Sequence, residues 1–160
     1  MSVEIRKVDF LNTHEAQHLL MLLGNYALDK QGRGEPLSQY VQENLIGELQ
    51  KSPIAVCFIA YKNSKPIGLA NCFYAFSTFS AKPLLNVHDL IVVDGNRGEG
   101  IGTKILNAVE NEAKSKGCCK VTLEVLQNNE RAKRVYQSFG FAGYNLGEEE
   151  NNALFWQKKI

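Results

Sequence analysis

The chain has 160 residues, of which 44% are hydrophobic and 22% are charged, and its formal net charge is +1. This length fits one domain with a buried core, and the composition excludes an intrinsically disordered chain. The balanced charge gives no reason to expect a nucleic-acid partner, and no apolar run reaches the roughly 18 residues that span a bilayer. The first residues do not resemble a signal peptide. We therefore expect one cytoplasmic domain over residues 1–160, with no membrane partner.

The N-terminal third predicts one strand and two helices. Alternating apolar residues predict a short strand at 2–8. Thr13 is a suitable N-cap for a leucine-rich helix that reaches Tyr26, and Ser38 is a suitable N-cap for a second helix that Pro53 ends. The segment between these helices, at 29–36, is rich in glycine and proline and predicts a loop.

The rest of the chain alternates strands and helices. Two β-type runs at 55–61 and 67–77 predict a hairpin. A strand at 85–93, a helix from 101 to a C-cap at Lys116-Gly117, a strand at 120–126 and a helix at 129–139 follow. Up to two strands end the chain, the last one containing Leu154, Phe155 and Trp156. This order predicts a mixed α/β (α+β) sheet with helices on its faces.

Two sets of residues contain possible metal ligands, namely the cysteines and the segment from His14 to His18. The four cysteines (Cys57, Cys72, Cys118 and Cys119) form no C-x-x-C pair, and we expect buried, reduced thiols.

The segment from His14 to His18 matches the H-E-x-x-H pattern of zinc proteases. Two histidines four residues apart share a helix face, so a zinc protease is an alternative to consider. This segment lies at the start of the predicted helix, and His88 is the only other histidine. We therefore expect no metal site.

A glycine-rich segment at 94–103 joins a predicted strand to a predicted helix. A helix N-terminus presents unpaired N–H groups and a partial positive charge, which suit a phosphate, and Arg97 adds a cation. The spacing of a P-loop is absent. The segment has the spacing G-x-G-x-G and not the G-x-G-x-x-G of dinucleotide-binding folds, although Glu124 lies near the distance of their acidic residue. A flexible turn without a ligand is the other alternative.

Arg97, Gly100 and Gly102 match the R-x-x-G-x-G/A signature of the GNAT N-acetyltransferase superfamily. The stretch from Asn129 through Tyr136 to Gly140-Phe141 resembles the family's downstream pattern, so the resemblance covers about residues 54–143. It implies a GNAT-like acyl-CoA N-acyltransferase fold, with a mostly antiparallel sheet, a central parallel strand pair and helices on both faces. It also implies acetyl-CoA as co-substrate and a homodimer.

The resemblance also assigns roles in binding acetyl-CoA. The backbone of Leu90, Ile91 and Val92 would hold the acetyl–pantetheine arm, and one of these N–H groups could polarise the thioester carbonyl. Asn129 would hydrogen-bond the same arm, or it serves only as a helix N-cap. The pyrophosphate would bind at Arg97, Gly98, Gly100, Ile101, Gly102 and Thr103.

Two residues are candidates for proton transfer. Tyr136 would act as general acid, because a phenol with a pKa near 10 is protonated at neutral pH; the alternative is a core tyrosine. His88 is the candidate general base, with Asp89 or a water chain as alternatives, and we expect Asp89 to point to the other side of the strand.

The expected reaction is acetyl transfer to a primary amine by a direct ternary complex. The segment 84–92 is most similar to the polyamine (spermidine/spermine-type) branch, in which an acid stands where this chain has His88. The loop expected to select the amine, at 26–40, mixes Lys30 and Arg33 with Asp29 and Glu35. A polyamine, an amino acid, a related metabolite or a protein N-terminus therefore stay open as acceptors. A non-catalytic acyl-CoA-binding module is the alternative function.

Overall fold

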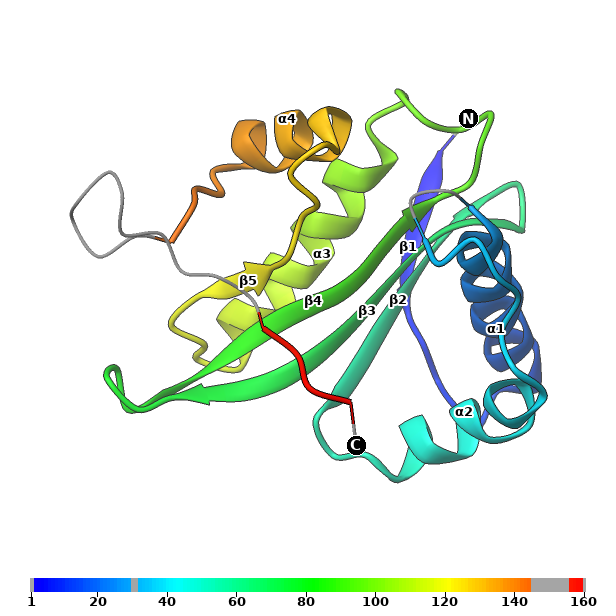
Figure 1. The fold of residues 1–160 in the computed structure, drawn as a ribbon, viewed down its shortest axis with the longest axis horizontal. Coiled ribbons are helices and arrows are strands. Elements are labelled where there is room, and N and C mark those ends of the chain that lie inside the picture. Colours follow the sequence, from blue (N-terminus) through cyan, green and yellow to red (C-terminus); the bar gives the residue numbers. More distant parts are fainter. Residues whose placement is uncertain (1, 30–31, 145–155, 160) are drawn as a thin grey trace. The chain divides into compact units, whose positions relative to one another are not determined.

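The computed structural model describes residues 2–29, 32–144 and 156–159. The chain forms two compact units, residues 1–126 and residues 127–160. The first unit contains β1 (Val3–Lys7), α1 (Thr13–Leu28), α2 (Gln39–Lys51), β2 (Ala55–Lys62), β3 (Lys65–Ser77), β4 (Lys82–Val92), α3 (Ile101–Ser115) and β5 (Val121–Leu123) (Figure 1). The second unit contains α4 (Glu130–Phe139).

The predicted mixed sheet is confirmed. Its strands lie in the order β1-β2-β3-β4-β5, with antiparallel pairing from β1 to β4 and a parallel pair between β4 and β5. The parallel pair lies at one end of the described sheet. The predicted C-terminal strands fall mostly on residues 145–155, which lie outside the described residues.

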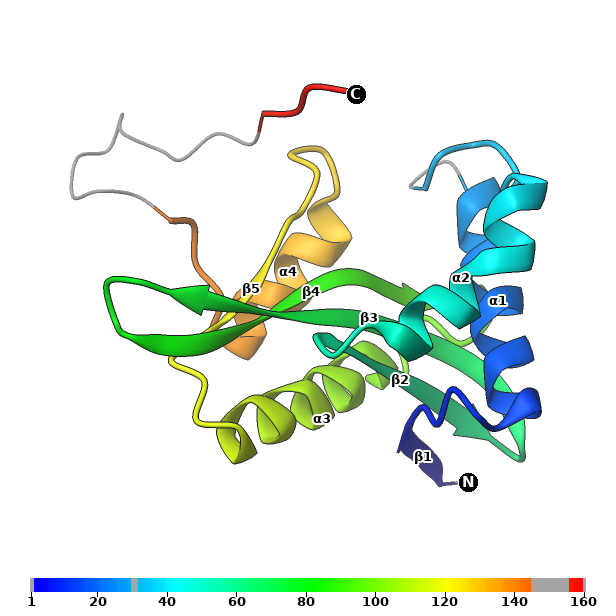
Figure 2. The ribbon, with the colours of Figure 1, turned by 90° about the horizontal axis from the view of Figure 1, so that it is seen from below.

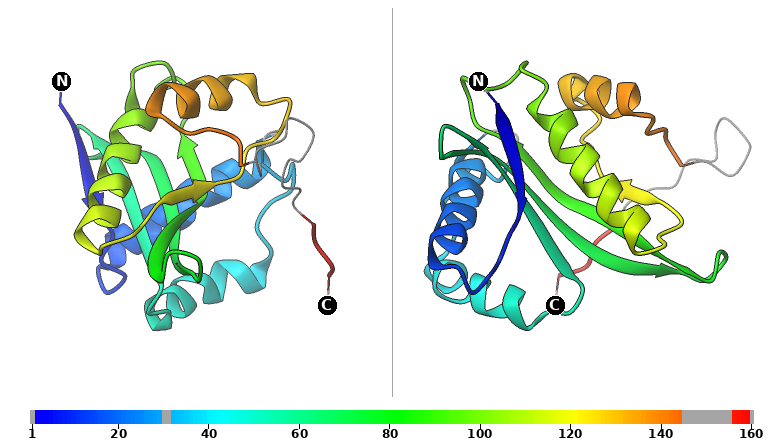
Figure 3. Two further views of the ribbon diagram at one scale, coloured as in Figure 1. Left: turned by 90° about the vertical axis from the view of Figure 1, so that its left-hand side faces the viewer. Right: turned by 180° about the vertical axis from the view of Figure 1, so that it is seen from behind.

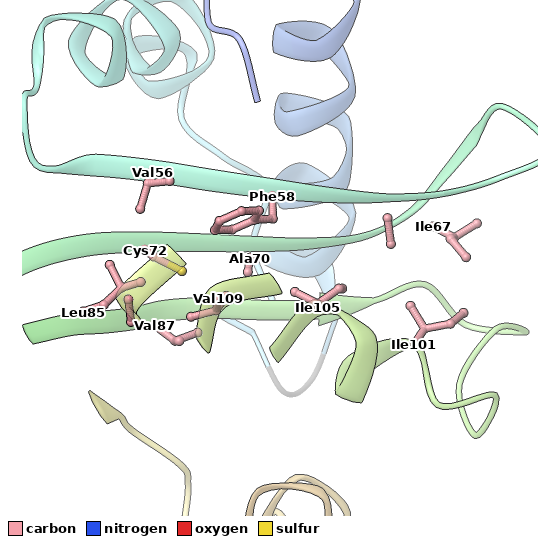
Figure 4. Packing of buried hydrophobic residues seen from close by; sticks show 12 residues of the cluster. Val56, Phe58, Ile67, Ala70, Cys72, Leu85, Val87, Ile101, Ile105 and Val109 are labelled. Atoms are coloured by element: carbon pink, nitrogen blue, oxygen red, sulfur yellow. The ribbon is translucent and has the colours of Figure 1, made fainter. Parts of the chain in front are cut away.

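Helices cover both faces of the sheet, as expected. Helix α3 lies on one face of the sheet, and α1 and α2 lie on the other (Figures 2 and 3). Figure 4 shows the α3 face, where Ile105 and Val109 lie against Phe58, Ala70 and Leu85 of the strands.

Gly68 allows α3 to approach the sheet closely. A Cβ atom at this position would lie 2.9 Å from Ile105 Cδ1 and 3.0 Å from the Ile91 carbonyl oxygen. A larger residue at position 68 would therefore separate α3 from the sheet.

The helix ends follow local capping rules, with one difference from the prediction. The Ser38 hydroxyl accepts from the Val41 N–H, and Gly117 has a positive φ of 68°, both as predicted. Thr13, however, is the first helical residue and not the N-cap. Asn12 is the cap, because its extended backbone lets its side-chain oxygen accept from the N–H groups of His14 and Glu15.

The cysteines are all free thiols, but they are not all buried. Cys57 and Cys72 lie in the core, and burial raises the pKa of both thiols, that of Cys57 to about 12. Cys118 is partly exposed and Cys119 is exposed, which contradicts the prediction. The reason is that β5 begins only at Val121, so both residues lie in the connection after α3.

Glu112 of α3 joins three elements of the first unit. It accepts hydrogen bonds from the Lys7 ammonium group and from the Tyr74 hydroxyl, each 2.7 Å long. Burial acts against ionisation of the Glu112 carboxyl, but these donors prevail and lower its pKa. The ionised carboxylate therefore stabilises the folded protein above the usual range of a glutamate pKa, and this contribution is lost as pH falls through the lowered value.

Glu112→Gln is expected to lower the free energy of unfolding at pH 7 by about 1–2 kcal/mol, because the charged hydrogen bonds are weakened. Urea titrations of the wild type and the variant should give a difference that narrows as the pH falls below 4. The control is Glu110→Gln, which removes an exposed helical ion pair with Lys114 and should change stability much less. A Glu112→Gln difference that is equal at pH 3 and pH 7 would contradict this interpretation.

Candidate active site

A β-bulge in β4 brings two side chains to one face of the sheet. Cys72 is opposite Val87 and Asn71 is opposite Asp89, so His88 is an extra residue in β4. Asp89 accepts a hydrogen bond of 2.9 Å from the Asn71 amide, and the His88 ring contacts Phe73 with 5.8 Å between ring centroids.

Phe73 and Leu69 pack with the cluster under α1 and α2, whereas Ala70 and Cys72 pack under α3. By strand alternation, Asn71 lies on the face covered by α1 and α2. Its partner Asp89 and the Phe73 neighbour His88 therefore lie on that face too. The expectation that Asp89 points away from His88 is wrong, because the bulge interrupts the alternation.

One edge of β4 is left without a strand partner within the described part of the chain. β5 pairs only with residues 85–87 of β4. The Val93 N–H donates to the Ile67 carbonyl of β3, at 2.9 Å. By alternation, the backbone groups of Leu90 and Val92 point away from β3, whereas those of Ile91 point towards it. An extended ligand could therefore pair with Leu90 and Val92, while the Ile91 side chain is buried in the core.

The glycine-rich loop after β4 has an open backbone. Gly95, Gly98 and Gly100 have positive φ angles of 84°, 90° and 74°, and no other described atom lies within 4 Å of where their Cβ atoms would be. Gly100 is the N-cap of α3 and supplies no side-chain cap. The first turn of α3, with Gly102 and Thr103, contains no acidic residue, so it favours an anion. Ile101 is buried and fixes this turn to the core.

The Arg97 side chain holds the loop in place. Its guanidinium donates to the Val92 carbonyl at 2.9 Å and forms ion pairs with Asp29 at 3.0 Å and Asp94 at 2.7 Å. Asp29 is the C-cap residue of α1. Arg97 therefore connects the end of β4, the glycine loop and the end of α1. No local pattern indicates the contact with Asp29, which lies 68 positions away in the chain.

Acidic and phenolic groups surround the bulge on the α1 side. Burial raises the pKa of Tyr26; the nearby carboxylates of Asp89 and Asp29 raise it further, and Arg97 opposes them. The phenol of Tyr26 is therefore neutral at physiological pH. Asn71 was not predicted as a site residue, although a polar residue in the apolar run 67–73 could have indicated one.

Two predicted site residues lie in the second unit. Asn129 is the N-cap of α4, and its side chain accepts from the Ala132 N–H at 3.1 Å. Tyr136 lies about two turns further along the same helix, and its ring contacts Phe141 with 6.0 Å between centroids. The structure thus brings Asn129 and Tyr136 together in one unit. The other predicted residues (His88, Leu90, Ile91, Val92 and 97–103) lie in the first unit.

The H-E-x-x-H segment contributes to the packing of α1. The His18 ring nitrogen Nδ1 lies 3.1 Å from the Tyr61 hydroxyl, and the Glu15 carboxylate accepts from the Asp9 N–H. Across the described residues, no three histidine, cysteine or acidic side chains are grouped as metal ligands. In the same part of the chain, no helix is long and apolar enough to cross a bilayer.

Comparison with known proteins places this arrangement in a family. The model of the acetyltransferase (GNAT) family matches residues 22–141. The chain is 31% identical over 87 residues to the uncharacterized N-acetyltransferase YhfO of Bacillus subtilis, which covers 54% of this chain and 58% of that protein. It is 31% identical over 98 residues to thialysine N-epsilon-acetyltransferase of Bos taurus, which covers 56% of this chain and 57% of that protein. The chain thus matches less than two thirds of the length of these relatives.

A solved structure supports the same fold. The aminoglycoside N-acetyltransferase AAC(6')-Iy, in complex with the bisubstrate analog CoA-S-monomethyl-acetylneamine, aligns with a TM-score of 0.76 and 18% identity over 100% of both chains. At this identity the likeness concerns the fold alone. Together with the family match over residues 22–141, it shows that this chain belongs to the GNAT family of acetyltransferases.

Proposed function

We propose that this protein is an acetyl-CoA-dependent N-acetyltransferase that acts on a primary amine. The observation that carries the proposal is the open edge of β4 leading into an open glycine loop at the start of α3. The pantetheine arm of acetyl-CoA contains amide groups that can pair with Leu90 and Val92 as a strand would. The pyrophosphate suits the N–H groups of residues 98–103, and the exposed Lys104 adds a positive charge in the same helical turn.

The proposed reaction is a direct transfer within a ternary complex. The acceptor ammonium first loses a proton to a base at the β4 bulge, where His88 and Asp89 are the candidates. The free amine then attacks the thioester carbonyl, and the carbon–sulfur bond breaks. The nitrogen loses a second proton, the departing thiolate takes up one, and one proton is released to solvent overall. A backbone N–H of the open edge would stabilise the charge on the carbonyl oxygen.

The second unit would complete the site. We propose that the two units act as one domain, with Asn129 hydrogen-bonding the pantetheine arm and Tyr136 donating a proton to the thiolate. Support comes from the family match, which spans residues of both units, and from the placement of both side chains on α4. A cytoplasmic location and a homodimer are further parts of this proposal.

The acceptor is proposed to be a small cationic amine. Asp89 is a partly exposed carboxylate at the bulge, which favours an ammonium group there. The relative that is named for thialysine supports the side-chain amine of an amino acid as one such acceptor.

The test is a panel of amines incubated with purified protein and acetyl-CoA. Mass spectrometry would identify the N-acetylated product, and CoA release would be measured in parallel. We expect equal amounts of N-acetylated amine and CoA with at least one polyamine or lysine-like amine. Binding of acetyl-CoA without transfer to any amine would favour the alternative, a non-catalytic acyl-CoA-binding module.

A further inference from the structure

Asn71 is a buried polar residue in an otherwise apolar stretch of β3. Its side chain is only 4% exposed, and it is the one buried polar or charged residue within the described parts of the chain. Its amide nitrogen donates to Asp89 Oδ2 at 2.9 Å. Its amide oxygen Oδ1 is buried and has no hydrogen-bond partner among the described residues.

This arrangement of Asn71 lowers the stability of the folded protein, so stability alone does not explain it. A buried amide with an unpaired oxygen destabilises a protein, whereas an apolar residue of similar shape would avoid that cost. The partner Asp89 is partly exposed, so water could solvate its carboxylate without Asn71. The hydrogen bond is therefore better explained by what it does to Asp89: it fixes the carboxylate on the α1 side of the bulge.

Asp89 lies close enough to Tyr26 of α1 and to Cys57 of β2 to raise the pKa of both groups, and His88 is its neighbour in the bulge. Arg97 is already engaged by Asp29, Asp94 and the Val92 carbonyl. The Asp89 carboxylate accepts from a neutral donor, the Asn71 amide.

We infer that Asn71 is a positioning residue that holds the Asp89 carboxylate as the acceptor of the proton from the substrate ammonium. Asp89, and not the neighbouring His88, is then the general base of the bulge. This inference rests on the proposed N-acetyltransferase function. In the proton transfer, one N–H bond of the ammonium breaks, and an O–H bond forms on Asp89, directly or through one water molecule.

The test compares the pH dependence of kcat/KM for the amine in four variants. Asn71→Leu removes the donor and the unpaired oxygen, and it should lower kcat/KM about tenfold and move the acid limb to higher pH, because the ionised carboxylate loses its hydrogen bond. Thermal stability should stay equal or rise, and the KM for acetyl-CoA should change less than about twofold. Asn71→Asp, which preserves the shape of the side chain, should move the acid limb further to higher pH. A second carboxylate beside Asp89 disfavours the ionised form of Asp89. Asp89→Asn should remove the limb, whereas His88→Ala should leave it in place.

The control is Asn86→Leu, which removes the amide of an asparagine in the neighbouring strand β4, whose side chain donates to Thr122. It should leave the acid limb unchanged. A wild-type pH profile in Asn71→Leu or in Asn71→Asp would overturn the inference, as would loss of the limb in His88→Ala. Absence of transfer in the wild-type protein with every amine would instead contradict the proposed function, so the two failures are distinguishable.

Discussion

Tyr136→Phe is expected to lower kcat about 100-fold while the KM for acetyl-CoA changes little. A general acid typically contributes this much or more to the rate, and phenylalanine keeps the ring contact with Phe141 while removing only the proton donor. Steady-state kinetics at saturating amine would measure the effect.

The matched control for this change is Tyr144→Phe, which removes the hydroxyl of an exposed tyrosine in the same unit. It should keep the wild-type kcat. If Tyr136→Phe kept more than half of the wild-type kcat, Tyr136 would be a packing residue of α4, and the thiolate would obtain its proton from solvent or from another group.

Arg97→Ala is expected to lower the free energy of unfolding and to weaken the binding of acetyl-CoA. It removes the donor to the Val92 carbonyl and the ion pair with Asp29, which is mostly buried. The free energy of unfolding should fall by about 1–3 kcal/mol. The KM for acetyl-CoA should rise about tenfold, equivalent to ~1.4 kcal/mol, because a loop that must be ordered on binding costs affinity. Denaturant titration and steady-state kinetics would measure the two effects.

Two other variants separate the roles of Arg97. Arg97→Lys keeps the charge, but an ammonium group cannot donate to three acceptors in a planar arrangement. The loss of stability and the rise in the KM for acetyl-CoA should therefore lie between those of the wild type and those of Arg97→Ala. Asp94→Ala removes the exposed partner and should change stability by no more than about 0.5 kcal/mol. A rise in KM for Arg97→Ala without any loss of stability would show that Arg97 acts on the phosphates and does not hold the loop.

The glycine loop could be predicted from the sequence because it is local. Arg97, Gly100 and Gly102 lie within six residues, and the strand before them and the helix after them have clear apolar patterns. The same holds for Asn129 as a helix cap and for the end of α3 at Lys116-Gly117.

The arrangement at the bulge could not be predicted, since it depends on pairing between strands. No residue in 84–92 marks a bulge, and a regular alternation puts His88 and Asp89 on opposite faces. The contacts of Asn71 with Asp89 and of Arg97 with Asp29 join residues 18 and 68 positions apart. Such contacts follow from the fold and not from a local pattern.

The central claim is that the open edge of β4 and the glycine loop together hold the acetyl donor. Amide hydrogen exchange of the wild-type protein, measured with and without acetyl-CoA, tests it most directly. We predict slower exchange at Leu90, Val92 and residues 98–103 on binding, and unchanged exchange in β1. Binding of acetyl-CoA that leaves exchange at Leu90, Val92 and residues 98–103 unchanged would contradict the account.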